Sequence, residues 1–241
     1  MEPSTSDILI AWERGLHQSP GERALTLLSL SDETMDAKEL LPAGRRDAAL
    51  LRIRRRLLGD RIDGVVACKD CGASLDVTLS VASLLPDETI AASASASVDV
   101  DGWKIAFRVP TAADLAALRG VSGVEHGLSL LLRRCVIAAE RDGSAVDIDE
   151  IEPAAAAALD EALAAVDPAG DTTLLLRCPA CGAQNEAIFD SPSFLWRETQ
   201  LLARGALLEV HDLASAYGWT EPQILALNPA RRRFYLEAVG A

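Results

Sequence analysis

Two cysteine pairs of identical spacing constrain this chain more than any other feature. Each pair forms a Cys-x-x-Cys-Gly sequence, first at residues 68–72 and again at residues 178–182. Two residues between the cysteines let both thiolates point at one metal ion, and the glycine permits the φ angle that the turn needs after the second ligand. Two such turns facing each other supply four thiolates in tetrahedral geometry. The sequence therefore predicts one metal site with the ligands Cys68, Cys71, Cys178 and Cys181.

Other uses of these cysteines fit the chain less well. The N-terminus lacks the basic and apolar segments of a signal peptide, and no run of about 18 apolar residues could cross a membrane. We therefore expect a cytoplasmic chain without a membrane segment, where disulfides are rare. Iron could occupy the same geometry, but zinc is the usual metal of a structural site. Four thiolates leave no open coordination position for a catalytic water, so the expected Zn²⁺ is structural.

Strand and helix patterns place the cysteine pairs in an α+β chain. Alternating apolar and polar residues predict short strands on both sides of each pair. A further hairpin is expected at 96–109, with Asp101-Gly102 as its type I′ turn. The fifth cysteine, Cys135, is expected to be a buried thiol on a helix face. The abundant alanine and leucine favour helices, which we expect at 7–17, 45–58, 124–139, 153–166 and 192–217.

Several helix ends carry side-chain or glycine signals. Ser19 with Glu22 predicts a capping box, and Thr111 with Asp114 predicts another helix start. Gly218 is expected to end the long C-terminal helix, because glycine adopts the left-handed conformation found after many helices.

The pattern predicts a zinc ribbon that carries an inserted β-hairpin and helices, flanked by helical arms at both ends. Loop-closure entropy grows only logarithmically with length, so a long insertion between the two cysteine turns is tolerable. The expected segments are an N-terminal helical arm, a zinc ribbon in two parts, an insertion and a C-terminal helical segment, at residues 1–62, 63–82 plus 171–191, 83–170 and 192–241 respectively.

Charge is unevenly distributed along the chain. The net charge of −13 disfavours tight binding to nucleic acid, which is a polyanion. The segment 45–61 nevertheless holds seven arginines, whereas 140–171 is acidic with Arg141 as its only base. The arginines of the helix at 45–58 are expected to face water or extend along the surface. They can form a solvated face or an electrostatic docking surface for a partner, for which the candidates are Arg52, Arg55 and Arg56.

The C-terminal helices offer a second candidate partner surface. Aromatic residues and arginines are frequent interface anchors, and here they are Trp219, Arg231, Arg232, Phe234 and Tyr235. The alternative is that the aromatic residues pack the helices against one another. Together with a zinc ribbon, these helices also allow a DNA-binding regulator that uses residues 231–233, although the acidic chain argues against it.

The sequence carries no recognisable catalytic signature. It has no His-Glu-x-x-His, no Gly-x-Ser-x-Gly and no phosphate-binding glycine loop. His211-Asp212 could belong to a metal-dependent hydrolase, but no supporting set of histidines and acids accompanies it. We therefore expect no enzyme, no catalytic residue and no small-molecule substrate.

Motifs at both ends of the chain point to a known family. They are Trp12-Glu13-Arg14-Gly15, residues 20–28, Arg108-Val109-Pro110-Thr111, residues 194–198 after the second cysteine turn, and residues 209–214, 217–221, 224–227 and 231–236. This set resembles T-even-type baseplate or baseplate-hub assembly proteins of contractile phage tails and phage-like contractile injection systems.

The resemblance implies a non-enzymatic role in building a contractile tail, as a hub assembly chaperone or a minor baseplate component. Partners would be baseplate, hub, spike or tail-tube proteins. The protein would be cytoplasmic when made and could later join the assembled particle.

Overall fold

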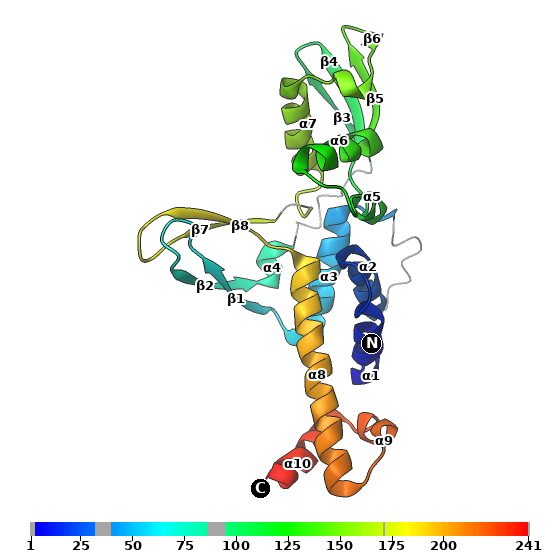
Figure 1. Ribbon diagram of the computed structural model, residues 1–241, viewed down its shortest axis with the longest axis vertical. Coiled ribbons are helices and arrows are strands. Elements are labelled where there is room, and N and C mark those ends of the chain that lie inside the picture. Colours follow the sequence, from blue (N-terminus) through cyan, green and yellow to red (C-terminus); the bar gives the residue numbers. More distant parts are fainter. Residues whose placement is uncertain (1–2, 32–39, 86–94, 171, 241) are drawn as a thin grey trace.

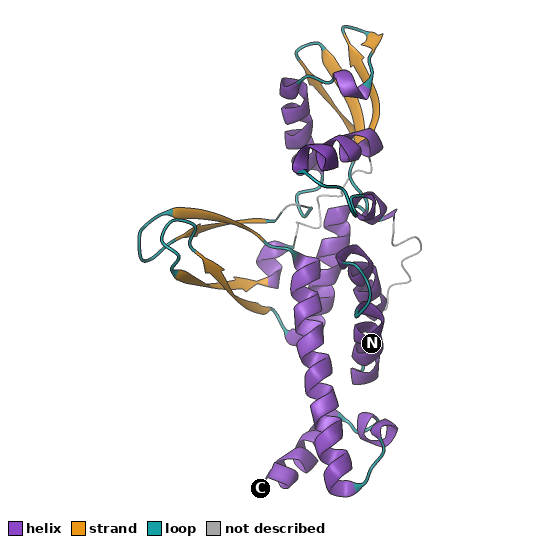
Figure 2. Cartoon of the chain, viewed as in Figure 1, coloured by secondary structure: helices purple, strands orange, loops and turns teal. Residues whose placement is uncertain are grey.

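The computed structural model describes residues 3–31, 40–85, 95–170 and 172–240. The molecule is elongated, with a long helix, α8 (Ser191–Tyr217), along its axis (Figure 1). One end carries a lobe of helices and strands, formed by residues 95–167, and the other end carries a group of short helices. Two β-hairpins project from the side. Helices and three small antiparallel sheets make up the described chain (Figure 2), which confirms the α+β class.

The expected segments are covered only in part. Residues 1–2 and 32–39 of the N-terminal arm, 86–94 of the insertion, 171 of the second ribbon part and 241 at the C-terminus lie outside the described residues. Within the described part of the chain, no helix is both long and apolar enough to span a membrane.

Three helices form the N-terminal body beside α8. They are α1 (Thr5–Gly15), α2 (Pro20–Leu27), which continues into a 3-10 turn at Leu28–Leu30, and α3 (Ala43–Leu58). The expected capping box of α2 is present, because the Ser19 amide donates to Glu22 Oε2 at 2.8 Å. α3 ends at Gly59, whose φ of 82° is open to glycine but strained for other residues.

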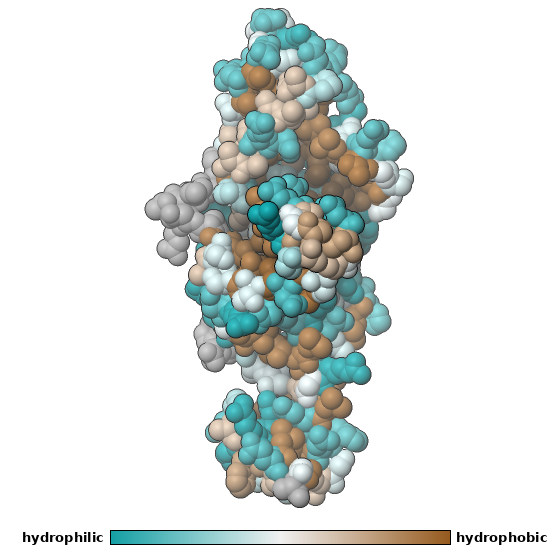
Figure 3. All heavy atoms as spheres, turned by 90° about the vertical axis from the view of Figure 1, so that its left-hand side faces the viewer, coloured by the Kyte–Doolittle hydropathy of each residue, from teal (hydrophilic) through white to brown (hydrophobic). Residues whose placement is uncertain are grey.

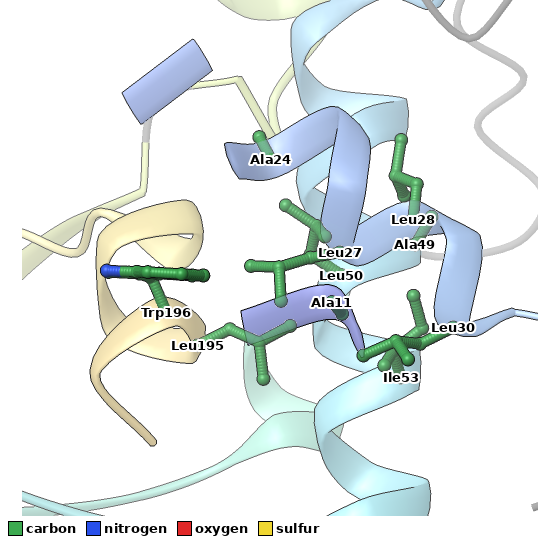
Figure 4. Close-up of a cluster of buried hydrophobic side chains, with 10 residues drawn as sticks. All are labelled: Ala11, Ala24, Leu27, Leu28, Leu30, Ala49, Leu50, Ile53, Leu195 and Trp196. Atoms are coloured by element: carbon green, nitrogen blue, oxygen red, sulfur yellow. The ribbon is translucent and has the colours of Figure 1, made fainter. Parts of the chain in front are cut away.

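A buried apolar cluster joins these helices to the start of α8. Figure 4 shows Leu195 and Trp196 of α8 extending toward the side chains of the N-terminal helices. The Trp196 ring lies against the backbone of Gly15, where an added Cβ would be 2.3 Å from ring atoms. Arg23 completes the contact: its guanidinium lies 4.7 Å from the Trp196 ring centroid, and its Nε donates to the Gly15 carbonyl at 2.8 Å.

The expectation that the arginines of α3 face water or extend along the surface is wrong at two positions, because Arg46 and Arg54 are buried. Arg54 binds Glu198 of α8 with an Nη2–Oε1 distance of 2.9 Å and donates from Nη1 to the Gly59 carbonyl at 2.6 Å. A buried guanidinium needs such partners to offset its lost hydration. The position of Glu198, far along the chain, provides this partner and could not be read from the local pattern.

The strands expected around the cysteine pairs form two separate hairpins, which we call the cysteine hairpins. The first pairs β1 (Arg61–Ala67) with β2 (Ser74–Ser80), and the second pairs β7 (Thr173–Arg177) with β8 (Gln184–Ile188). A short helix, α4 (Val81–Leu84), follows β2. At their base the hairpins share an apolar cluster with α3, α4 and α8, formed by Leu51, Ile62, Val81, Phe189 and Phe194 with their neighbours.

The insertion contains more sheet than expected. β3 (Ser95–Val100) and β4 (Trp103–Arg108) form the predicted hairpin, and the positive φ values of Asp101 (46°) and Gly102 (81°) agree with a type I′ turn. β5 (Val136–Arg141) pairs with β4, and β6 (Ser144–Ala145) follows β5. Helix α7 (Pro153–Val166) packs on β3 and β4.

α5 (Ala112–Ala117) begins at the predicted Thr111 cap. The helix expected at 124–139 is correct only as far as Cys135, where α6 (Val124–Cys135) ends. The next residues pair with β4 instead, so Val136 and Ala139 enter the apolar core of the lobe. Tertiary pairing therefore overrides local helix propensity here. Cys135 itself is buried, as predicted.

Two points of the insertion are attached to the start of α3. Directly after β4, the Pro110 carbonyl accepts from the Ala43 amide at 2.9 Å. Near the C-terminal end of the insertion, Asp167 Oδ2 accepts from the Gly44 amide at 2.8 Å. Pro42 offers no side-chain cap to α3, so Asp167 supplies the missing acceptor from a distant part of the chain.

The buried carboxylate of Asp114 joins several elements of the lobe. Asp114 accepts from Arg108 Nη1 at 2.5 Å and from Arg134 Nε at 2.8 Å. Burial by itself would raise the pKa of Asp114. Hydrogen bonds from Arg108, Thr111 and Arg134 outweigh burial and hold the pKa of this carboxyl below its usual range.

The C-terminal segment is helical throughout. α8 ends at Gly218, which has the predicted left-handed conformation with φ 69°. α9 (Glu221–Leu225) and α10 (Pro229–Gly240) then turn back toward α8, as Figure 1 shows.

We expect Gly15→Ala to lower the free energy of unfolding by about 1–3 kcal/mol, because the new methyl group would overlap the Trp196 ring. Gly21→Ala is the matched control, since nothing lies within 4 Å of the Cβ it would add. Urea unfolding of both variants checks this. Equal stability of the two would contradict the close packing of α1 on α8.

We expect Asp114→Asn to lower the free energy of unfolding by about 2 kcal/mol at pH 7, since charged hydrogen bonds to two arginines are lost. The folded pKa of Asp114 lies below the unfolded value of about 4. Its contribution is therefore complete above about pH 5 and declines as the pH falls through 4 toward the folded pKa. Unfolding curves measured between pH 7 and pH 3 should show the wild type and the variant converging; parallel curves would exclude this role.

Candidate metal centre

The four predicted ligands meet at the outer ends of the cysteine hairpins. All four sulfur atoms lie within 4.8 Å of one another. Two pairs each join one hairpin to the other: Cys68 to Cys181 and Cys71 to Cys178, both with 3.7 Å between the sulfurs. Residues 107 positions apart in sequence are therefore adjacent at this site.

The sulfur positions fit a tetrahedral four-thiolate metal site. With zinc–sulfur bonds of about 2.3 Å, the sulfurs of such a tetrahedron are about 3.8 Å apart. The Cys68–Cys181 and Cys71–Cys178 separations of 3.7 Å match this value, and the cysteines are free thiols rather than disulfides. Soft thiolate donors in this arrangement suit zinc or iron, so the donor set fits the predicted metal in both chemistry and geometry.

Each cysteine pair lies in a turn of the same construction, which we call the first knuckle (68–72) and the second knuckle (178–182). In the first, the Cys68 amide donates to the Ala73 carbonyl at 2.8 Å and the Gly72 amide to the Cys68 carbonyl at 3.0 Å. The second repeats both bonds at 2.9 Å. Gly72 and Gly182 have φ values of 73° and 77°, the left-handed conformation expected for the residue after the second ligand.

The thiols influence one another's ionisation. Backbone amides of Cys71 and Asp70 donate to the Cys68 sulfur and lower the pKa of this thiol to about 6. The Ala183 amide likewise favours the Cys181 thiolate, but the neighbouring Cys71 and Cys178 sulfurs outweigh it and raise the Cys181 pKa to about 12. Four thiolates this close repel one another, and a divalent cation among them removes that repulsion.

A fifth side chain, Asn185 of β8, belongs to the centre and was missed in the sequence. It is buried, accepts from the Lys69 amide at 2.8 Å and donates to the Cys68 sulfur at 3.5 Å. A signal was present, because Asn185 is a polar residue at an inward position of a short strand. The corresponding inward residue after the first knuckle is the apolar Leu75.

The candidate partner residues lie away from the cysteines. Arg52, Arg55 and Arg56 are exposed on α3. The other candidates lie beyond the far end of α8, in the helical group at the opposite end of the molecule from the lobe (Figure 1). Neither set contributes to the metal centre.

The C-terminal aromatic residues pack against one another, as the alternative interpretation of the sequence allowed. Trp219 is half-buried and stacked on Tyr217, with 4.7 Å between ring centroids. Tyr235 packs edge-on against Trp219 at 4.9 Å. Phe234 remains 66% exposed. The aromatic side chains therefore pack the helices together, and Phe234 in addition faces solvent.

The two C-terminal arginine candidates differ in their surroundings. Arg232 pairs with Glu209 of α8, with 2.8 Å between Nε and Oε2, and donates to the Thr5 hydroxyl at 3.1 Å. It therefore holds α10 to α8 and α1. Arg231 is exposed.

Among the described residues, the four cysteines form the one group of three or more potential metal ligands that converge. His211 has no such group around it. The second metal site that a hydrolase would need at His211 is therefore absent from the part of the chain that the structure describes.

The chain matches the model of a protein family described as T4 bacteriophage base plate protein over residues 5–196. It belongs to this family. The match runs from α1 through both cysteine hairpins to Trp196, and so includes the Gly15–Trp196 contact and the metal centre. The expected baseplate resemblance is confirmed, and the chain is a structural component of the baseplate type. No curated protein and no solved structure matches the chain.

We expect Cys178→Ser to weaken zinc binding by more than about 100-fold, which exceeds the usual effect of changing a residue that only hydrogen-bonds to a ligand. We also expect it to lower the midpoint temperature of thermal unfolding. A hydroxyl is a poor substitute for a thiolate, and structural metal binding contributes to the free energy of folding. The measurement is metal content by elemental analysis together with thermal unfolding. Cys135→Ala is the control, because Cys135 lies in the lobe and not among the four sulfurs. Unchanged zinc content in Cys178→Ser would rule out this ligand set.

Proposed function

We propose that this baseplate protein is a non-enzymatic assembly or structural component of a contractile tail. In the protein, one structural Zn²⁺ would join the two cysteine hairpins as a zinc ribbon. The single observation that carries the proposal is the convergence of four sulfurs from two knuckles in a member of a baseplate family. Four protein ligands close the coordination sphere, which supports a structural rather than a catalytic metal.

The packing of the hairpins supports a metal ion at their tips. The described strands of the cysteine hairpins form two separate two-stranded sheets with no hydrogen-bonded ladder between them. Between the apolar base and the cysteine tips remains a hollow of about 370 Å³, which Gly64, Val77, Leu174 and Ala187 help to line. Small two-stranded hairpins are marginally stable alone. Zinc at the tips would supply the second attachment that the packing does not.

A fastened pair of hairpins would present a defined surface to other baseplate proteins. Figure 3 looks at the molecule from the side of the hairpins and shows apolar patches among hydrophilic ones on that face. Val65, Leu175 and Ile188 are exposed apolar residues of the hairpins. Contiguous exposed apolar patches mark many protein–protein contact sites, so this face is a candidate for contact with another baseplate protein.

Charged and aromatic residues elsewhere supply two further candidate surfaces. Arg52, Arg55 and Arg56 form an exposed stripe on α3, which favours an acidic partner. Arg231 and Phe234 project from α10, which has no buried residue of its own. Arg232, Trp219 and Tyr235 would support this second surface from within rather than contact the partner.

The partners we propose are baseplate, hub, spike or tail-tube proteins of the same particle. Two roles fit: a minor component that stays in the baseplate, or a chaperone of hub assembly that leaves it. The same assignment extends to phage-like contractile injection systems. Neither the family match nor the described part of the structure supports the alternative of a DNA-binding regulator.

The test is co-purification from the native producer, with zinc measured in the recovered protein. We expect tail proteins together with one zinc per chain. Replacing Arg52, Arg55 and Arg56 by alanine should reduce recovery of an acidic partner by about tenfold, and less so at high salt, where surface charge is screened. Arg204→Ala, an exposed arginine outside both surfaces, is the control.

Recovery from finished particles would assign the protein to the baseplate itself, and recovery from assembly intermediates alone would assign a chaperone role. Recovery of DNA without tail proteins would overturn the proposal in favour of the regulator.

A further inference from the structure

The metal centre has an asymmetry that neither knuckle shows alone. The inward residue four positions after the second cysteine is Leu75 in the first hairpin and Asn185 in the second. Both side chains are buried beside the sulfurs. Leu75 packs in the apolar cluster around Cys68 and Cys178, whereas Asn185 forms hydrogen bonds to Lys69 of the first knuckle and to Ala183, directly after the second.

The contacts of Asn185 fix the orientation of its amide. Its oxygen accepts from the Lys69 backbone amide at 2.8 Å, and its nitrogen donates to the Ala183 carbonyl at 3.2 Å. Exchanging oxygen and nitrogen would place donor against donor and acceptor against acceptor. The amide nitrogen is therefore the group that faces the Cys68 sulfur, 3.5 Å away.

The same bond could not form on the other side. The residue that corresponds to Lys69 in the second knuckle is Pro179, which has no backbone N–H to donate. Leu75, in turn, has no acceptor. The donor and the acceptor are thus both present across one diagonal of the centre and both absent across the other, so one side-chain bridge joins the knuckles through protein atoms.

We infer that Asn185 is an outer-shell positioning residue that sets the zinc affinity of this centre. The inference rests on the proposed structural zinc. By holding Lys69, Asn185 keeps the first knuckle in register with the second before metal binds. By donating to Cys68, it withdraws charge from one thiolate of a site whose four thiolates and Zn²⁺ carry a net charge of −2. Groups that hydrogen-bond to metal ligands generally tune affinity in this way.

The experiment compares full-length wild type, Asn185→Leu and Gln184→Leu. Gln184 lies on the same strand and faces solvent, so it is the matched control. Zinc affinity is measured by competition with a chromophoric chelator. We expect a loss of about 10- to 100-fold for Asn185→Leu and none for Gln184→Leu.

Cobalt(II) in place of zinc gives a readout that loss of stability alone would not move. All four thiolates remain in Asn185→Leu, so the sulfur-to-cobalt charge-transfer band should keep its intensity. Without the hydrogen bond, Cys68 becomes a stronger donor, and the band should shift to longer wavelength. Asn185→Asp provides a second variant of nearly the same size: it keeps an acceptor for Lys69, loses the donor and adds negative charge, so we expect it to bind zinc more weakly still.

The outcomes separate this inference from the proposed function. Weaker zinc binding with a shifted cobalt band in Asn185→Leu would support it. Zinc affinity equal to that of the wild type and of Gln184→Leu would overturn it and leave the structural zinc intact. A wild type that binds neither zinc nor cobalt would overturn both.

Discussion

Four sulfur atoms within 4.8 Å of one another are the constraint on which the side-projecting part of this protein depends. The cysteine hairpins share an apolar base with the helices but form no common sheet. The thiolates at their tips repel one another when ionised. A metal ion bound between the thiolates would make them the strongest attachment in the region. Asn185 adds a bridge between the knuckles that does not depend on the metal.

The helical body gives this attachment a fixed frame. Trp196 lies near the start of α8, which follows the second cysteine hairpin, and packs on Gly15 at the end of α1. Arg54 binds Glu198, two residues further along α8. The chain that leaves the metal centre is therefore locked at once to both the first and the third helix. Gly15 and Trp196, near the two ends of the segment that matches the baseplate family, thus meet in one close contact.

The insertion is attached by different chemistry. Pro110, after β4, and Asp167, near the end of the insertion, accept hydrogen bonds from the first backbone amides of α3, for which Pro42 offers no side-chain cap. Asp114 ties its first helix to α6 and β4 through two arginines. The acidic lobe, the basic helix α3 and the cysteine hairpins thus have defined relative positions, as a component of a larger assembly requires.

The sequence by itself determined what short-range chemistry decides: the two matching cysteine turns, the type I′ turn at Asp101-Gly102, the Ser19 and Thr111 caps, and the helix end at Gly218. Each depends on residues a few positions apart. Only the tertiary structure decided that Arg54 is buried, that residues 136–141 form a strand, that Asn185 bridges the knuckles and that Trp219 stacks on Tyr217. Three of these depend on partners from distant or separately folded elements, and even the nearby Trp219 and Tyr217 meet only because the chain turns back after α8. Burial and long-range hydrogen bonding set these outcomes, and local propensity does not encode them.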